Sequence, residues 1–486
     1  MIEVIVNRPS FEYDIHSLVK SFFPREDVQI HVQDTFTEDT ALRISVEFTD
    51  ETVSICLMEQ GEEKESGASV INYAERKETK NRLKRQLYQL LCAYTGQTLP
   101  WGTLTGIRPA KIAMGLIEQG MSNVETAEYM RNTYLASKEK VALSVMIANR
   151  ERYVLRNIDY KDGYSLYVGI PFCPSICLYC SFSSYPLERW RKQVDQYLDA
   201  LCKELDYVAD RFRDKKLNTV YIGGGTPTTL EPYQLDRLLT RIQSKFDTEH
   251  LQEFTVEAGR PDSITREKLQ VLLDHGVDRI SVNPQSLEDH VLTAIGRRHT
   301  ARDVEEAMAL ATGMGFPHVN MDLIAGLPED TPEGFRRTLD KCLSYGADNI
   351  TVHTLSLKKG SRILLENFTI PSAEAVGEML DYANAALRQA DFHPYYLYRQ
   401  KYMSGSFENT GWCISGAEGL YNIYIMEELH SILSLGAGGS TKMVDPVHQR
   451  IERVFHTKYP TEYIQRSEKL EENLSAFRQF HENMRG

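Results

Sequence analysis

Residues 165–182 read SLYVGIPFCPSICLYCSF, and this stretch decides the fold that the sequence predicts. Its first six residues form a short apolar run that is typical of a buried strand. A loop with three cysteines follows directly: Cys173, Cys177 and Cys180, in the spacing Cys-x3-Cys-x2-Cys. The pattern therefore places three thiols at the end of one strand.

Similar apolar runs recur after this first strand, and amphipathic helical segments separate them. Such an alternation predicts βα units around a parallel sheet. In βα folds the working groups lie at the carboxyl ends of the strands, whether the sheet is open or closed into a barrel. The predicted strands are SLYVGI, NTVYIGG, EFTVEAG, DRISVNP, HVNMDLIAG and NITVHTL.

The chain has a different texture on either side of these units. The N-terminal part combines strand-like runs (MIEVIV, VQIHVQ, ALRISVEF and TVSICLM) with helical stretches at about 74–94 and 110–155. Near the C-terminus the periodicity weakens, and two or three helices accompany the aromatic, basic stretch PYYLYRQKYMSG. We predict an N-terminal α/β accessory domain at 1–160, a βα core domain at 161–370 and a smaller C-terminal, substrate-covering domain at 371–486.

The composition is that of a globular protein. Of the 486 residues, 42% are hydrophobic and 25% charged, which excludes a disordered chain or a collagen-like repeat. The net charge of −13 argues against general binding of nucleic acid. No apolar run approaches the ~18 residues of a membrane span, and MIEVIVNRPSFEYD lacks the features of a signal peptide. We expect a cytoplasmic protein.

Three kinds of site could use the cysteine loop. Structural zinc needs four ligands, and no second cysteine pair or nearby histidine completes such a set. Cys177 and Cys180 alone would suit a thiol redox pair. Three thiolates on one loop best suit a [4Fe–4S] cluster, because they hold three irons and leave the fourth open to a chelating cofactor.

Further polar and glycine motifs follow the later strands. The second strand runs into GGGTPT at residues 223–228, where glycines let the backbone approach a ligand closely, although a plain tight turn is the alternative. It is not a P-loop, because no G-K-[ST] follows. Three successive predicted strands each carry a polar side chain in or at the end of the strand, namely Glu257, Gln285 and Asp322. Each alone could be a helix cap or a loop anchor, but together they indicate a ligand site.

These motifs resemble a known family. The cysteine spacing, with Tyr179 before the last cysteine, resembles the radical S-adenosylmethionine (SAM) superfamily. LYVGIPFCPSICLYCSF resembles the oxygen-independent coproporphyrinogen III oxidase family, and in particular its HemZ-type branch. The resemblance covers about residues 165–365 and extends loosely toward the C-terminus. It implies an α/β fold whose core is a radical SAM partial (β/α)6 TIM-like barrel.

The resemblance also implies cofactors and their ligands. The three cysteines would hold the [4Fe–4S] cluster. SAM presents an ammonium, a carboxylate and a ribose diol; carboxylates suit the first and third, and an arginine suits the second. Arg297, twelve positions after Gln285, matches the arginine of the family motif. The implied SAM contacts are Tyr167, Tyr179, Gly224, Gly225, Thr226, Glu257, Gln285, Arg297, Asp322 and Ser356.

In this family an electron passes from the reduced cluster to SAM, and the resulting 5′-deoxyadenosyl radical takes a hydrogen from a propionate side chain. The resemblance therefore implies decarboxylation of coproporphyrinogen III to protoporphyrinogen IX without oxygen, with a flavodoxin- or ferredoxin-type electron donor. No catalytic residue beyond the cluster and SAM ligands is implied. Local positive charge would have to attract the acidic tetrapyrrole, and the candidates are Arg298, His299, Lys358, Lys359, Arg399 and Lys401.

Two positions depart from the well-studied branch of the family. Phe182 stands where that branch has a further cysteine, and Gly169 stands where it has a histidine. Phe182 is shared with the heme-chaperone-like relatives, which bind heme and a cluster without the dehydrogenase reaction. A further relative uses the same scaffold for a radical methylation that opens the heme ring. These two activities are the alternatives to the dehydrogenase.

Overall fold

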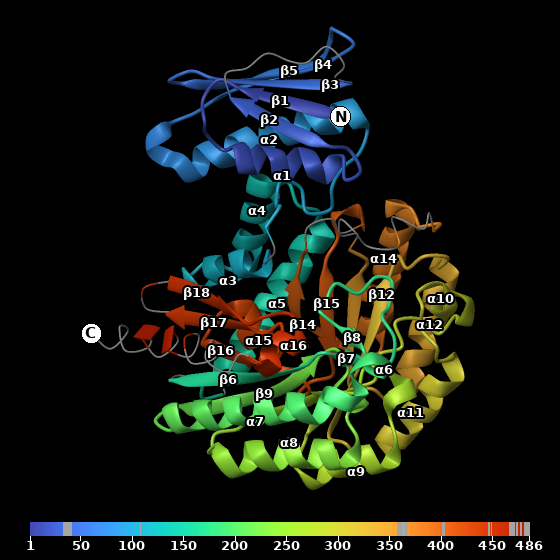
Figure 1. Cartoon of the computed structure of the whole chain (residues 1–486). Coiled ribbons are helices and arrows are strands. Elements are labelled where there is room, and N and C mark those ends of the chain that lie inside the picture. Colours follow the sequence, from blue (N-terminus) through green and yellow to red (C-terminus); the bar gives the residue numbers. More distant parts are fainter. Residues whose placement is uncertain are drawn as a thin grey trace. The chain divides into compact units, whose positions relative to one another are not determined.

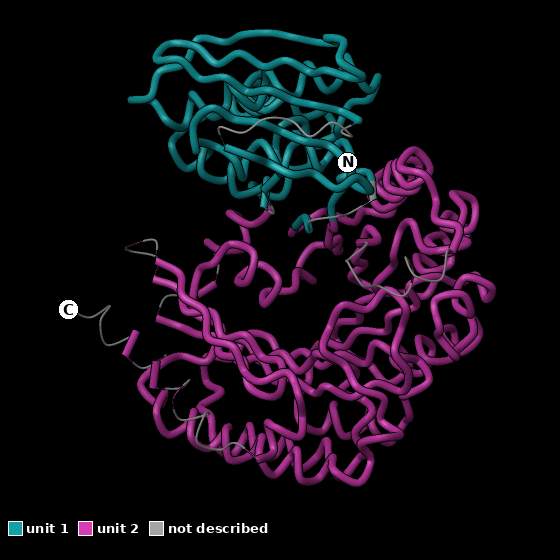
Figure 2. The backbone as a smooth tube through the Cα atoms, turned by 45° about the horizontal axis from the view of Figure 1, so that its top comes forward, with its two compact units in different colours: residues 1–149, 397–408 teal, residues 150–396, 409–486 magenta. Residues whose placement is uncertain are grey.

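The computed structural model describes residues 1–32, 41–106, 108–156, 158–160, 162–356, 363, 368–400, 404–445, 448, 450–465, 472, 475–476 and 479–480. The chain forms two compact units (Figure 2). Unit 1 comprises Met1–Asn149 and Leu397–Glu408, and unit 2 comprises Arg150–Tyr396 and Asn409–Gly486. In the described part of the chain, no helix is both long and apolar enough to cross a membrane.

Unit 1 contains a five-stranded sheet in the order β2-β1-β3-β4-β5, and helices α1 and α2 lie against one of its faces (Figure 1). β1 is parallel to β2 and β3, whereas β4 and β5 continue the sheet antiparallel. In β3 every second side chain is buried, so that one face packs on the helices. The bounds are β1 Ile2–Val6, α1 Glu12–Phe22, β2 Val28–Val32, β3 Leu42–Phe48, β4 Thr52–Glu59, β5 Glu62–Val70 and α2 Arg76–Thr95.

The strands and helices predicted in the first 95 residues are confirmed, and β5 was not predicted. Its sequence, EEKESGASV, has no apolar alternation, because β5 is an edge strand whose first three side chains are exposed. The helical stretch predicted at 110–155 consists of three helices, α3 Ala110–Glu118, α4 Asn123–Tyr134 and α5 Lys138–Arg156. Ser122 and Glu125 form a capping box at the start of α4, and Leu135, with φ 56°, ends it.

A buried polar cluster connects residues 397–408 to the rest of unit 1. Glu408 accepts a hydrogen bond from the indole Nε1 of Trp101 (2.8 Å) and pairs with Lys140. The guanidinium of Arg399 donates to three backbone carbonyls, those of Leu104, Ser406 and Phe407. Arg399 is therefore a buried structural residue, and the expectation that its charge faces a ligand is wrong.

Unit 2 is built on an eleven-stranded sheet in the order β14-β15-β13-β12-β11-β10-β9-β6-β16-β17-β18. Its six central strands are parallel and coincide with the six predicted ones, which confirms the α/β barrel-type core. Helices cover the outer side of these strands (Figure 1). The strands are β6 Gly163–Ile170, β9 Lys216–Gly224, β10 Glu253–Glu257, β11 Arg279–Ser281, β12 His318–Ala325 and β13 Asn349–Thr354. The helices are α7 Val194–Arg211, α8 Pro232–Lys245, α9 Arg266–Asp274, α10 Asp289–Ala294, α11 Ala301–Gly313 and α12 Pro332–Ser344.

The C-terminal part of the chain extends this sheet at both ends. β14 and β15 continue beyond β13, and β16 pairs in parallel with β6 and continues into β17 and β18. Three helices agree with the prediction for this part, whereas its five strands were not predicted. The division into domains at residues 160 and 370 stays a prediction. The elements are α14 Ala373–Gln389, β14 His393–Tyr398, β15 Asn409–Cys413, α15 Leu420–Glu427, β16 Ser431–Leu435, β17 Ser440–Asp445, β18 Arg450–Phe455 and α16 Pro460–Gln465.

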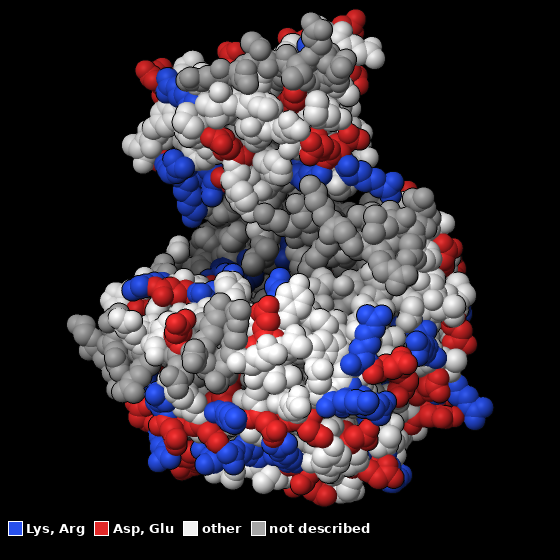
Figure 3. All heavy atoms as spheres, in the orientation of Figure 1, with Lys and Arg blue, Asp and Glu red and all other residues white. Residues whose placement is uncertain are grey.

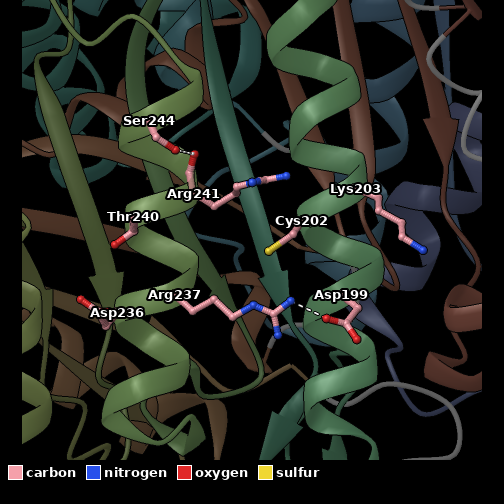
Figure 4. Close-up of a pocket in the computed structure, with 8 residues that line it drawn as sticks. All are labelled: Asp199, Cys202, Lys203, Asp236, Arg237, Thr240, Arg241 and Ser244. Carbon is pink, nitrogen blue, oxygen red and sulfur yellow. Dashed lines mark hydrogen bonds and ion pairs between the residues drawn. The ribbon is translucent and has the colours of Figure 1, made fainter.

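Acidic and basic side chains are intermixed over the outer helices of unit 2, as Figure 3 shows for α7 and α8. Some of them form ion pairs between the two helices, such as Arg237 with Asp199 and Arg241 with Asp206. Asp199, Arg237 and Arg241 also line a pocket of about 680 Å³ (Figure 4). This pocket lies in the outer helical layer, whereas the carboxyl ends of the strands carry the residues predicted for the site.

Candidate functional site

The cysteine loop follows β6 and is closed by a short ladder. Phe172 and Cys173 (β7, Phe172–Cys173) pair with Tyr185 and Pro186 (β8, Tyr185–Pro186). All eight cysteines of the chain are free, so no disulfide ties up the loop. Cys173 and Cys177 are each 9% exposed, and Cys180 is half-buried. The three thiols are thus close to the surface but shielded from most solvent.

Two of the three thiols, those of Cys173 and Cys180, have raised pKa values and so favour the protonated form while no metal binds them. Burial raises the pKa of Cys173 to about 11, although a hydrogen bond from the Thr226 hydroxyl (3.5 Å) opposes the shift. Burial likewise raises the pKa of Cys180. Iron would have to displace these protons, because the thiolate is the metal ligand.

The donor set fits an iron–sulfur cluster rather than a single ion. Across the described residues, no three His, Cys, Asp or Glu side chains lie close enough together to hold one metal ion. A cluster makes a different demand, because each cysteine binds its own iron and the sulfur atoms stay apart. Three free thiols on one shielded loop meet that demand.

The glycine motif after β9 packs directly against the cysteine loop. The backbone N–H of Gly225 donates to the carbonyl of Ile170, and that of Thr226 donates to the carbonyl of Phe172, both at 2.7 Å. A Cβ atom at Gly225 would lie 2.6 Å from that Phe172 carbonyl oxygen, and Gly224 has a φ of 107°. Only glycine fits this close approach, so the turn is a built contact.

Glu257 ends β10 beside the same glycines. The Tyr221 hydroxyl donates to Glu257 Oε1 (2.6 Å), and a Cβ atom at Gly223 would lie 3.0 Å from the carboxyl carbon. Burial raises the pKa of Glu257 to about 7, and the nearby Asp322 adds to the shift. Such a carboxylate favours a cationic ligand, which would restore its charge.

Asp322 lies on β12 and faces polar neighbours on its own and the adjacent strand. Asn320 Nδ2 donates to Asp322 Oδ1 (2.8 Å), and His353 Nε2 lies 3.7 Å from Asp322 Oδ2. Burial alone would raise the pKa of Asp322, but His353, Asn320 and Thr351 together lower it. Asp322 is therefore the ionised member of the two inner carboxylates.

Gln285 and Arg297 bring further polar groups to this end of the sheet. Gln285 has a left-handed φ of 68°, its N–H donates to the Asp322 carbonyl (2.9 Å), and its Oε1 is buried without a hydrogen-bond partner. Arg297 is 8% exposed; Nη2 donates to the Tyr179 hydroxyl (3.0 Å), and Nε has no partner. Burial opposes the charge of Arg297, but Tyr179 and Cys177 raise its pKa overall. Unsatisfied buried atoms at both residues suit a polar ligand.

The structure brings most of the predicted residues into one contiguous set. Thr226 contacts Cys173, Arg297 joins Tyr179 to Cys177, and Gln285 contacts the strand of Asp322. Tyr167 stacks on Tyr221 with ring centroids 6.0 Å apart. Ser356 lies half-buried two residues beyond β13, and its place in the site stays a prediction.

The structure describes three of the six charged candidates for the tetrapyrrole, namely Arg298, His299 and Arg399. His299 is only 3% exposed, and neither of its nitrogens has a hydrogen-bond partner, whereas Arg298 is exposed. The expectation that His299 offers a positive charge is wrong, because burial and two nearby arginines lower its pKa to about 3. Lys358, Lys359 and Lys401 lie outside the described residues.

Several residues of the site were missed by the sequence analysis. Tyr221 could have been found, because it precedes Gly223 by two positions and so points to the same side of β9. Tyr421 stacks on Tyr221 at 4.4 Å but comes from α15, and no sequence signal links the two. His353 lies within a predicted strand and Arg260 comes directly after one, but only the structure shows what they contact.

The comparisons with known proteins agree with this geometry. The model of the radical SAM superfamily matches residues 167–342, within the core of unit 2. The fold resembles that of coproporphyrinogen III oxidase (HemN) from Escherichia coli, described as a radical SAM enzyme, with a TM-score of 0.53 and 23% identity over 65% of this chain and 72% of that one. The family model thus identifies a radical SAM domain at residues 167–342, and this superfamily implies an iron–sulfur cluster and SAM as cofactors.

Relatives among characterised sequences define the branch. The oxygen-independent coproporphyrinogen-III oxidase-like protein HemZ of Bacillus subtilis is 38% identical over 81% of this chain and 79% of its own length. The heme chaperone HemW of the same organism is 31% identical over 64% of this chain and 82% of its own length. The chain therefore belongs to the coproporphyrinogen III oxidase-like family of radical SAM proteins, in the branch of HemZ.

Proposed function

We propose that this protein is a radical SAM enzyme of tetrapyrrole metabolism that decarboxylates coproporphyrinogen III to protoporphyrinogen IX without oxygen. The observation that carries the proposal is the contact between the cysteine loop and a polar set at the strand ends, through Thr226 with Cys173 and Arg297 with Cys177. Such contacts would place a cluster-bound cofactor among carboxylates, an amide and an arginine. The relationship to HemZ supports the tetrapyrrole as substrate class.

In this proposal Cys173, Cys177 and Cys180 hold a [4Fe–4S] cluster, and its open iron takes SAM. When bound, the cluster and SAM would supply a radical that takes a hydrogen atom from a propionate; loss of carbon dioxide, with one electron passing to an external one-electron acceptor, would leave a vinyl group. The flavodoxin- or ferredoxin-type electron donor belongs to the proposal as well.

This chain's own residues would bind and orient SAM. Glu257 and Asp322 suit the ammonium and the ribose diol, and Arg297 suits the carboxylate. The backbone of Gly224 and Gly225 would border the methionine part. The unpartnered Gln285 Oε1 and Arg297 Nε supply the remaining hydrogen-bonding capacity.

A second candidate is a heme carrier, and one observation favours it. Phe182 stands where the well-studied branch has a cysteine, and its side chain is 72% exposed beside the cluster loop. An exposed aromatic ring suits a flat ligand such as heme. The relationship to the heme chaperone HemW points the same way.

The deciding experiment supplies the anaerobically reconstituted protein with reductant, SAM and coproporphyrinogen III. We expect loss of two carboxyl groups together with 5′-deoxyadenosine, both measured by mass spectrometry. An intact substrate with SAM still cleaved would overturn the dehydrogenase. Repeating the assay with heme would then separate a carrier, which retains heme unchanged, from an enzyme that opens the heme ring.

A further inference from the structure

Arg260 is buried beside the cysteine loop and uses all of its N–H groups there. Its side chain is 4% exposed. Nη1 donates to the Ser175 carbonyl (3.2 Å) and to Cys177 Sγ (3.7 Å), and Nη2 donates to Ser175 Oγ (3.1 Å). Nε and Nη2 also bind the two carboxylate oxygens of Asp262 at 3.0 and 2.9 Å. The five N–H groups of a guanidinium are thus all satisfied.

Hydrogen bonds also fix the backbone around Arg260. Its carbonyl accepts bonds from the N–H (2.9 Å) and the hydroxyl (2.7 Å) of Ser263. The Ser263 hydroxyl in turn contacts Thr228 Oγ1 in the glycine motif at 2.6 Å. On the other side, Ser175 Oγ donates to the Gly296 carbonyl (3.3 Å). The guanidinium therefore sits at a fixed place next to one cluster cysteine.

The surroundings of Arg260 are electropositive. The cation of Arg297 also lies near Cys177, and its attraction to this sulfur contributes to the raised pKa of Arg297. The buried His299 nearby remains neutral, because burial and then the charges of Arg297 and Arg260 lower its pKa to about 3. In the described residues around this sulfur, Asp262 is the carboxylate that contacts Arg260.

We propose that Arg260 is a positioning residue that raises the reduction potential of the cluster through its charge and its N–H···S bond to Cys177. This inference rests on the cluster of the proposed function. One-electron reduction adds negative charge to the cluster, and a fixed cation in a shielded site stabilises the reduced state more than the oxidised one. Hydrogen bonds to the sulfurs of a cluster act in the same direction.

Because Arg260 and Asp262 carry opposite charges, removing one or the other should shift the reduction potential of the cluster in opposite directions. Arg260→Gln removes a positive charge and should lower the potential, whereas Asp262→Asn removes the opposing negative charge and should raise it. A residue that only shapes the loop would not give shifts of opposite sign. Arg260→Lys keeps the charge and should recover most of the potential.

The experiment uses the full-length protein, reconstituted anaerobically with iron and sulfide, without SAM or tetrapyrrole. Iron and sulfide content are measured first, and the midpoint potential is then followed by EPR during a redox titration. For Arg260→Gln we expect unchanged iron and a decrease of about tenfold in the equilibrium constant for reduction, which is 59 mV for one electron. Arg302→Gln, which removes an exposed arginine paired with Glu306, is the matched control and should not shift the potential.

Each result of the redox titration either supports or overturns the inference. Full iron with an unchanged potential in Arg260→Gln overturns this inference and leaves the proposed function standing. If Arg260→Gln fails to take up iron, Asp262→Asn decides in its place: a raised potential supports the inference, and an unchanged one overturns it. Wild-type protein without a cluster would overturn the proposed function itself.

Discussion

Glu257 should make the affinity for SAM depend on pH in the neutral range. Its pKa of about 7 means that the carboxylate is ionised in about one tenth of the molecules at pH 6 and in about half at pH 7. A cationic ammonium binds the ionised form, so the affinity should rise about fivefold between pH 6 and pH 7, or about 1 kcal/mol. Binding should also release about 0.9 proton at pH 6 and about 0.5 at pH 7.

The perturbation is Glu257→Gln, which keeps the shape of the side chain and removes the charge. A raised carboxyl pKa means that ionisation above the unfolded pKa opposes folding, so this variant should be at least as stable as the wild type near pH 7. Anaerobic calorimetry in buffers of different ionisation enthalpy gives both the affinity and the proton release. We expect weaker binding, no release of protons and no pH dependence between pH 6 and 7.

The other titratable side chains that face Glu257 are the tyrosines Tyr167, Tyr221 and Tyr421, together with Asp322 and His353. Of these, His353 is the side chain that can carry a positive charge, and that charge lowers the pKa of Glu257. His353→Gln is therefore the matched control and should retain the rise in affinity between pH 6 and 7. If Glu257→Gln kept the wild-type pH dependence while the histidine variant lost it, the reasoning about Glu257 would be refuted.

Three further variants test other parts of the site. An alanine variant of any of the three loop cysteines should lose the iron of the reconstituted protein, and the control Cys92→Ala should keep it. Full iron and full SAM cleavage in a loop variant would remove that cysteine from the ligand set. Arg297→Ala should bind SAM at least tenfold more weakly with the cluster still assembled, since a charge-assisted contact is worth about 1.5–3 kcal/mol, and an unchanged dissociation constant would exclude it from the site. Gly225→Ala should destabilise the protein by about 1–3 kcal/mol and reduce iron uptake, because its Cβ would meet a backbone oxygen at 2.6 Å. Gly313→Ala, at a helical glycine with no neighbour within 4 Å, should be neutral to slightly stabilising when the variants are compared by chemical denaturation, because alanine favours a helix over glycine.

The core of unit 2 could be predicted because its strands are continuous apolar runs. Strands buried on both sides, such as β6 and β9, carry that signal in their own residues. β16 and β18 do not. β16 is the five-residue run SILSL, and it becomes a strand by pairing with β6, more than 250 positions earlier. β18, RIERVF, is a mostly exposed edge strand whose apolar residues are too few to indicate it.

For the site, the sequence indicated which residues lie at strand ends but not which of them touch. The position of Glu257 followed from its strand, whereas its contact with the glycine motif is seen in the structure, where β9 and β10 are neighbours. Arg260 comes three residues later, in a loop where no periodicity fixes the direction of a side chain. Its bond to Cys177 depends on the path of another loop, so it could not be derived from the local pattern.

The loop also separates the proposed ligands of the cluster from Phe182, the position at which the family resemblance implies a difference between branches. Between Cys173 and Cys180 the loop is held by Thr226, by Arg260 and by the bond from the Leu178 N–H to the Ile295 carbonyl (3.0 Å). Phe182, two positions later, is 72% exposed, and its carbonyl accepts a bond from the nearby Ser184 N–H. A cysteine in its place would change what the loop presents outward without removing any of these contacts. We therefore expect Phe182→Cys to leave iron content and SAM affinity unchanged and to alter only the handling of the tetrapyrrole; a variant that lost its iron would show that the two roles of the loop are coupled.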